Sequence, residues 1–149
     1  MSRIASAVAL LLVASTTVRA QAQGKPAAKP TGSAMEGVSW ASLKGDWVGK
    51  VYRADKSVIS EVTTTFTADQ KVSITFLNRP AEQGRVIAMG GDSVVVELGP
   101  YKSVTREGHM VTTRMTSLVK NHMMSGTFHA KFDDGQTLDG TSEAAHKMK

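Results

Sequence analysis

The sequence predicts an all-β protein built on a single antiparallel up-and-down barrel of about eight strands. Between residues 46 and 144, apolar and polar residues alternate in short segments, the pattern of strands with one buried and one solvated face. Turn-forming residues separate these segments at hairpin spacing, and no long amphipathic helix interrupts them. So many strands must close or fold on themselves to cover their edges. We therefore predict a barrel, with a β-sandwich as the alternative.

The first elements follow from local residue preferences. Ser39 is suited to cap a short helical turn over residues 40–44, and Gly45 is suited to end it. The first strand is expected over residues 46–53. The second, over residues 58–67, places Val58, Val62 and Phe66 on one face. A third strand over 71–76, a polar loop over 78–83 and a fourth strand over 84–89 complete this half.

The second half continues the alternation. Gly90-Gly91-Asp92 predicts a hairpin, because glycine adopts the positive φ that tight hairpin turns require. A fifth strand runs to Leu98, and Gly99-Pro100 bends or breaks it before residues 101–106. Treating these two pieces as one bent strand gives eight strands in all. The last three are expected over residues 110–119, 123–132 and 137–144.

Residues 1–22 have the composition of a secretory signal peptide. Arg3 provides the positive charge, residues 4–14 are almost entirely apolar, and Ala20 and Ala22 frame a cleavage site. The apolar run is about 11 residues, whereas a membrane-spanning helix needs roughly 20. Ser15 stands where a lipoprotein would need the lipidated cysteine, and the chain has no cysteine. We expect an exported protein, periplasmic or extracellular, that is not a lipoprotein and has no membrane span.

The remaining chain divides into three parts. Residues 23–37 are rich in Gly, Pro, Ala and Lys and predict a flexible linker or disordered arm. Residues 38–145 form the barrel domain, and residues 146–149 are a short tail. The formal net charge of +5 falls to +3 if the signal peptide is removed with its two arginines. No arginine cluster with interleaved aromatic residues occurs, so nucleic-acid binding is not expected.

The segment Gly45-Asp46-Trp47, placed after a helical turn at the start of the first strand, resembles the opening of lipocalins and the wider calycin group. The resemblance implies that Trp47 lies inside the closed end of the barrel as a structural plug, and that the open end admits a small apolar ligand. Lipocalins usually place an arginine from the last strand across this tryptophan. Residues 137–144 contain no arginine.

Candidate ligand contacts are the large apolar residues expected to point inward away from the plug, namely Phe66, Phe76, Met115 and Phe128. Several other inward positions are small, including Gly126, Ala130 and Gly140. An eight-stranded barrel has just enough interior to be filled by side chains or to hold one small ligand, so small linings favour a cavity. A completely filled core remains the alternative.

The sequence shows no catalytic or metal-binding constellation. The four histidines, at positions 109, 122, 129 and 146, do not have the paired spacing of a zinc site. No Gly-x-Ser-x-Gly motif is present, and the lack of cysteine excludes a thiol nucleophile. Asp133-Asp134-Gly135 has the composition of a turn rather than a calcium loop. We expect no catalytic residues, no metal and no cofactor.

Two non-enzymatic hypotheses remain, beside a third in which an enzyme assembles its site from strand ends. The first is an exported, monomeric, lipocalin-like protein that binds a small hydrophobic ligand. The second is a non-enzymatic structural or protein-interaction module of the bacterial cell envelope.

Overall fold

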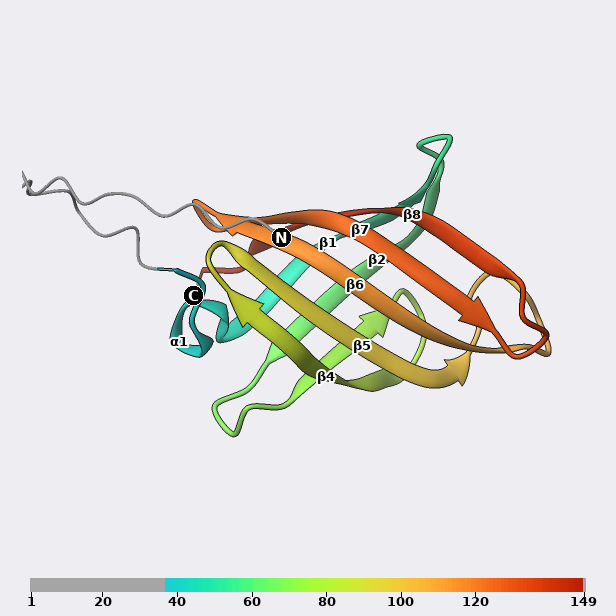
Figure 1. Cartoon of the computed structure of the whole chain (residues 1–149), viewed down its shortest axis with the longest axis horizontal. Coiled ribbons are helices and arrows are strands. Elements are labelled where there is room, and N and C mark those ends of the chain that lie inside the picture. Colours follow the sequence, from blue (N-terminus) through green and yellow to red (C-terminus); the bar gives the residue numbers. More distant parts are fainter. Residues whose placement is uncertain (1–36, 149) are drawn as a thin grey trace, which may run out of the picture. The chain divides into compact units, whose positions relative to one another are not determined.

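The barrel closes. The structure, a computed structural model, describes residues 37–148, so the predicted signal peptide and residues 23–36 of the predicted arm lie outside the described part. Eight antiparallel strands pair in sequence order, and the last pairs with the first (Figure 1). The prediction of an up-and-down barrel is therefore confirmed, and the sandwich alternative is wrong. The elements are α1 (Trp40–Leu43), β1 (Gly45–Arg53), β2 (Val58–Phe66), β3 (Val72–Phe76), β4 (Ala81–Gly90), β5 (Ser93–Lys102), β6 (Met110–Lys120), β7 (Met123–Phe132) and β8 (Thr137–His146).

Alternation along each strand separates one apolar core from the solvated surface. In β7, Met124, Phe128, Ala130 and Phe132 are buried, whereas the alternate residues Ser125, Thr127, His129 and Lys131 point outward and are exposed. The other strands repeat this pattern, so their inner faces meet in a single cluster of buried side chains. Among the described residues, no helix has the length and apolar character needed to cross a lipid bilayer.

One end of the barrel, which we call the base, is closed by α1, by the start of β1 and by the end of β8. Ser39 caps α1, since its hydroxyl accepts the backbone N–H of Ser42. Trp47 is only 1% exposed, and its indole N–H donates to the Leu43 carbonyl at 2.7 Å. The last strand extends to His146, one residue into the predicted tail. The imidazole lies 4.7 Å from the Trp47 ring between centroids, and its Nε2 donates to the Lys44 carbonyl at 3.1 Å.

One predicted strand boundary and one predicted side-chain orientation need correction. The fourth strand starts at Ala81 rather than Gly84, because Glu82 and Gln83 pair with β3 despite their polar side chains. In β2, Val58 points outward and is 49% exposed, although it was expected on the inner face. A register shift opposite Val51 and Tyr52 changes the alternation there and turns Ile59 toward the interior.

The segment around Gly99-Pro100 is one bent strand, as the eight-strand count requires. A register shift between Leu98 and Tyr101 bends β5, and Gly99 has a φ of 102°, which favours glycine. The strand nevertheless ends at Lys102, so the expectation of a strand through Arg106 is wrong. The chain instead forms a loop over residues 103–109, which we call the roof loop.

Candidate functional site

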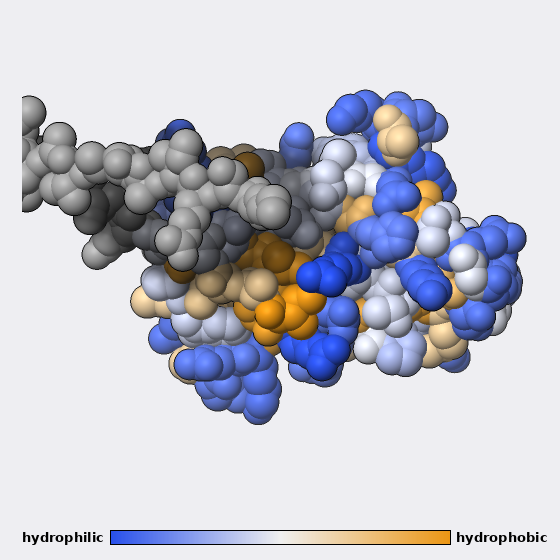
Figure 2. All heavy atoms as spheres, viewed as in Figure 1, coloured by the Kyte–Doolittle hydropathy of each residue, from blue (hydrophilic) through white to orange (hydrophobic). Residues whose placement is uncertain are grey.

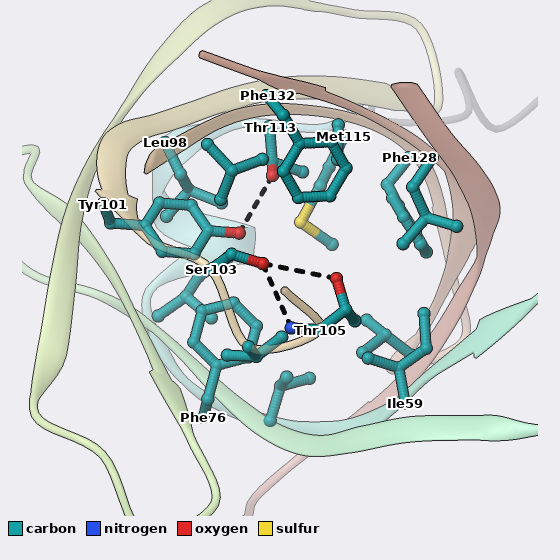
Figure 3. A pocket seen from close by; sticks show the side chains of 17 residues that line it. Ile59, Phe76, Leu98, Tyr101, Ser103, Thr105, Thr113, Met115, Phe128 and Phe132 are labelled. Atoms are coloured by element: carbon teal, nitrogen blue, oxygen red, sulfur yellow. Dashed lines mark hydrogen bonds between the residues drawn. The ribbon is translucent and has the colours of Figure 1, made fainter. Parts of the chain in front are cut away.

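A small apolar cavity lies in the half of the barrel opposite the base. The space open to the centre of a water molecule is about 40 Å³, far below the ~300–1,000 Å³ of pockets that take drug-sized ligands. Every strand except β4 contributes to its wall, and none of its lining side chains is charged (Figure 3). The lining consists of Val51, Ile59, Val62, Ile74, Phe76, Leu98, Tyr101, Ser103, Val104, Thr105, Val111, Thr113, Met115, Phe128, Ala130, Phe132 and Leu138.

Three of the four predicted ligand contacts meet in this cavity. Phe76, Met115 and Phe128 all lie on its wall (Figure 3). Phe66 does not, and this expectation needs correction: β2 ends at Phe66 on the base side, where the ring packs edge-on against Trp40 at 5.7 Å between centroids. Trp47 also lies at the base, among buried core residues and away from the cavity.

The small inward residues do not leave the open space that was expected of them. A Cβ atom added at Gly140 would lie 2.5 Å from Cε1 of Phe128, so the aromatic ring already fills the place of a side chain. At Gly126, an added Cβ would lie 2.0 Å from the Thr116 carbonyl oxygen, because the neighbouring strand passes very close. Glycine at these positions permits close packing of strands and rings, and the free volume is correspondingly small.

The roof loop separates the cavity from the solvent. Ser103 is 5% exposed, and its Oγ accepts the backbone N–H groups of Thr105 at 3.1 Å and Arg106 at 3.0 Å. The Ser103 N–H donates to the His109 carbonyl and closes the loop at its other end. Figure 3 shows Ser103 and Thr105 projecting across the cavity. Because the hydroxyl satisfies these backbone groups locally, the chain leaves the β-ladder here.

A wider groove lies on the other side of the roof loop. Its volume is about 940 Å³, and Ser103, Val104 and Thr105 line both the groove and the inner cavity. The groove is mixed in charge, and hydrophilic residues cover this end of the molecule (Figure 2). Its wall is formed by Arg79, Pro80, Glu82, Lys102, Ser103, Val104, Thr105, Glu107, Gly108, His109 and Met110.

Ion pairs connect the roof loop to the turn between β7 and β8. The Arg106 guanidinium donates to both carboxylate oxygens of Asp134, at 3.2 and 2.8 Å, and lies 4.7 Å from the centre of the Phe132 ring. His109 Nδ1 lies 2.8 Å from Oδ1 of Asp133. The hydrogen bond from Arg106 lowers the pKa of Asp134, and that from His109 lowers the pKa of Asp133. We call Arg106, His109, Asp133 and Asp134 the latch.

Part of the latch has the composition of a metal site. Ligand atoms of His109, Asp133 and Asp134 lie within 4.8 Å of one another, the one such group among residues 37–148. However, the Arg106 guanidinium contacts both oxygens of Asp134, and its charge opposes a second cation at the same place. The arrangement therefore acts as an ion-pair network that holds the roof loop.

A pair of hydroxyl groups breaks the apolar wall. Tyr101 and Thr113 are both about 6% exposed, and their hydroxyl oxygens share a hydrogen bond of 2.9 Å (Figure 3). The Tyr101 ring stacks on Phe76, with centroids 5.5 Å apart. Burial raises the pKa of Tyr101, so its phenol stays protonated well into the alkaline range. Sequence reasoning missed this pair, although Tyr101 follows the Gly99-Pro100 bend and Thr113 lies on the predicted inner face.

The chain matches no protein family. Comparison with curated proteins and with solved structures likewise finds no significant match. The geometry of the cavity, the roof loop and the latch is consequently the basis for assigning a function.

Proposed function

We propose that this protein binds one small, predominantly apolar molecule inside the barrel, beneath the roof loop. The observation that supports this proposal is an uncharged, apolar cavity that shares Ser103, Val104 and Thr105 of the roof loop with the groove outside it. Non-polar surface gathered around a few polar groups is typical of small-molecule sites.

The two ends of the barrel differ in how they are closed. At the base, Trp47 and Leu43 are almost completely buried and belong to the core. At the other end, the latch residues Arg106 and Asp134 keep about 30% of their side-chain surface exposed. Ion pairs in contact with water contribute little net stability, since solvent competes for both partners. Opening is therefore expected at the roof loop and not at the base.

Ligand binding requires the roof loop to move. The cavity of about 40 Å³ holds only a few atoms when the loop is seated. Displacing Ser103, Val104 and Thr105 joins the cavity to the groove of about 940 Å³, because these residues form the partition between them. With the roof loop seated the barrel is closed, and a ligand would select a conformation in which the loop is displaced.

The base supports a lipocalin-like assignment. His146 from the last strand lies across Trp47, where lipocalins usually place an arginine, and its Nε2 ties Lys44 to the barrel. His146 thus packs against Trp47 in place of the arginine that the last strand lacks. An exported, lipocalin-like carrier remains our proposal for the protein as a whole.

Displacement of an apolar fluorescent dye, together with native mass spectrometry, tests the proposal. We expect one dye per chain, displaced by small neutral apolar molecules. A cavity-filling variant, Ala130→Leu, should weaken dye binding at least tenfold, since Ala130 lines the cavity. The matched control is Thr127→Leu, on the outer face of the same strand. Equal dye binding by both variants, with folding verified by circular dichroism, would place the dye outside the cavity and reject the proposal.

An interaction module of the cell envelope is the second candidate. Leu118, Met123 and Val48 are exposed by 59, 52 and 48%, and Met123 and Val48 both pair with Ala145 near the base. Figure 2 shows apolar side chains gathered on the outer face toward that end. Pull-down from an envelope extract with the wild type and with Met123→Lys tests this candidate. A partner that the variant no longer retains would support it.

A further inference from the structure

We infer that the ligand is a neutral molecule with a carbonyl oxygen near one end, and that Tyr101 and Thr113 bind this oxygen. The inference rests on the proposed function and specifies the chemistry of the same site. The evidence for the inference is where hydroxyl groups lie on the cavity wall and the lack of charged residues there.

The hydroxyl pair has an unused donor. Each hydroxyl carries one hydrogen and two lone pairs, and the bond between Tyr101 and Thr113 uses only one of the two hydrogens. Neither hydroxyl makes another hydrogen bond within residues 37–148, and both side chains are about 6% exposed. The second hydrogen is therefore available to an acceptor in the cavity, and a carbonyl oxygen is such an acceptor.

The other hydroxyl groups on the wall belong to the roof loop, which must move when a ligand enters. The Oγ of Ser103 accepts two backbone N–H groups and lies 3.3 Å from the Thr105 hydroxyl. These contacts hold the roof loop in its folded form, and opening the loop displaces both hydroxyl groups from the cavity. The Tyr101–Thr113 pair is thus the polar position that can receive a ligand group with the least rearrangement.

Charge on the wall argues for a neutral ligand. None of the residues that line the cavity is charged. Two arginines close to this end of the barrel are held by other partners: Arg106 pairs with Asp134, and Arg79 donates to the Lys102 carbonyl at 2.8 Å. A carboxylate placed in the cavity would be buried without a cation, which is strongly unfavourable. Tyr101 cannot supply an opposite charge, because a phenol is neutral or negative.

The wall also fixes the direction of the ligand. Tyr101 lies near the roof-loop end of β5, where it pairs with Val111, and Thr113 lies two residues farther along β6. Met115 and Phe128 pair with each other deeper in the barrel. An apolar chain is expected along Met115 and Phe128, with its carbonyl group directly beneath the roof loop.

Affinities for 2-octanone, octane and octanoate, measured on the full chain by dye displacement, test this inference. The central variant is the double substitution Tyr101→Phe with Thr113→Val, which replaces both partners by apolar groups of similar shape and so leaves neither hydroxyl unpaired. We expect the double variant to bind 2-octanone about tenfold more weakly than the wild type while octane affinity is unchanged or higher. Thr112→Val, an outward neighbour on β6, is the control and should leave both affinities unchanged.

The outcomes separate the two levels of the proposal. Equal loss of octane and 2-octanone affinity in the double variant, or octanoate binding as tight as that of 2-octanone in the wild type, overturns the carbonyl inference and leaves apolar binding intact. Binding of none of the three probes rejects the proposed function itself. Infrared spectra of carbonyl-labelled 2-octanone bound to the wild type provide a measurement without any variant. The carbonyl stretch should shift to lower frequency than in hexane, and an unshifted band overturns the inference.

Discussion

Replacing Gly140 by alanine tests the close packing that leaves the cavity so small. The added Cβ would lie 2.1 Å from the Tyr52 carbonyl oxygen and 2.5 and 2.6 Å from two atoms of the Phe128 ring. Contacts with a real Cβ essentially never fall below 3.0 Å, so the Tyr52 carbonyl or β8 must move by almost 1 Å. Such a shift would disturb the hydrogen-bonded pairing of β1 with β8, in which Arg53 lies opposite Gly140.

The cost can be estimated from these contacts. Overpacking a close-packed core costs about 1–3 kcal/mol, and a weakened ladder hydrogen bond adds about 1 kcal/mol. We therefore expect Gly140→Ala to lower the free energy of unfolding by about 3 kcal/mol and the melting temperature by more than 10 °C. It should also weaken dye binding, because Phe128 lines the cavity and a shift of its ring changes the space there.

Gly90→Ala is the matched control. Gly90 also lies in a strand, but no atom lies within 4 Å of the added Cβ, and its φ is not in the left-handed region. This substitution should change stability by no more than about 0.5 kcal/mol. Urea unfolding of both variants decides the matter. If Gly140→Ala unfolds at the same urea concentration as Gly90→Ala, the close approach of β1, β8 and Phe128 does not exist as described.

Three further predictions concern the roof loop, the buried tyrosine and the base. Arg106→Gln should speed dye association in stopped-flow measurements while leaving equilibrium stability nearly unchanged, because it releases the latch and not the core; an unchanged rate would mean that dye does not pass the roof loop. Burial raises the pKa of Tyr101 above that of an unfolded tyrosine. The stability from keeping this phenol neutral is therefore complete below about pH 10 and is lost as pH rises through the folded pKa. Urea unfolding at pH 8 to 11 should show a smaller alkaline loss for Tyr101→Phe than for the wild type, and parallel curves would refute this. His146→Ala should cost about 1–2 kcal/mol and shift tryptophan emission to the red, since it removes the ring over Trp47 and the hydrogen bond to Lys44; unchanged emission would count against that contact.

The strand pattern was predictable because it depends on a local property. The buried face of β7 could be read from Met124, Phe128 and Phe132, since residues two apart share a face whatever the rest of the chain does. The position of a residue along the barrel axis, by contrast, could not be predicted from alternation. Phe66 and Phe76 are both inward-facing aromatic residues, yet one lies at the base and the other in the cavity. Their separation follows from strand direction and register, which alternation alone does not reveal.

The roof loop shows a second limit. Val104 lies between Ser103 and Thr105, so the segment alternates like a strand. Its backbone is instead satisfied by the Ser103 hydroxyl, and this competition depends on a side-chain position that periodicity does not detect. The latch could not be predicted from the sequence for a related reason. Arg106 and Asp134 are far apart in sequence and meet only because β6 and β7 bring their loops together.

Closure of the barrel by its first and last strands has a consequence for how the protein folds. Trp47 and His146 lie opposite each other although about 100 residues separate them in the chain. Such distant pairings must overcome a large loss of chain entropy, and all-β domains of this kind typically fold over milliseconds to seconds. Until β8 has been synthesised, β1 and β7 keep unpaired edges that another chain could extend. The molecule is therefore most vulnerable to aggregation during its synthesis, before the last ten residues of the barrel are in place.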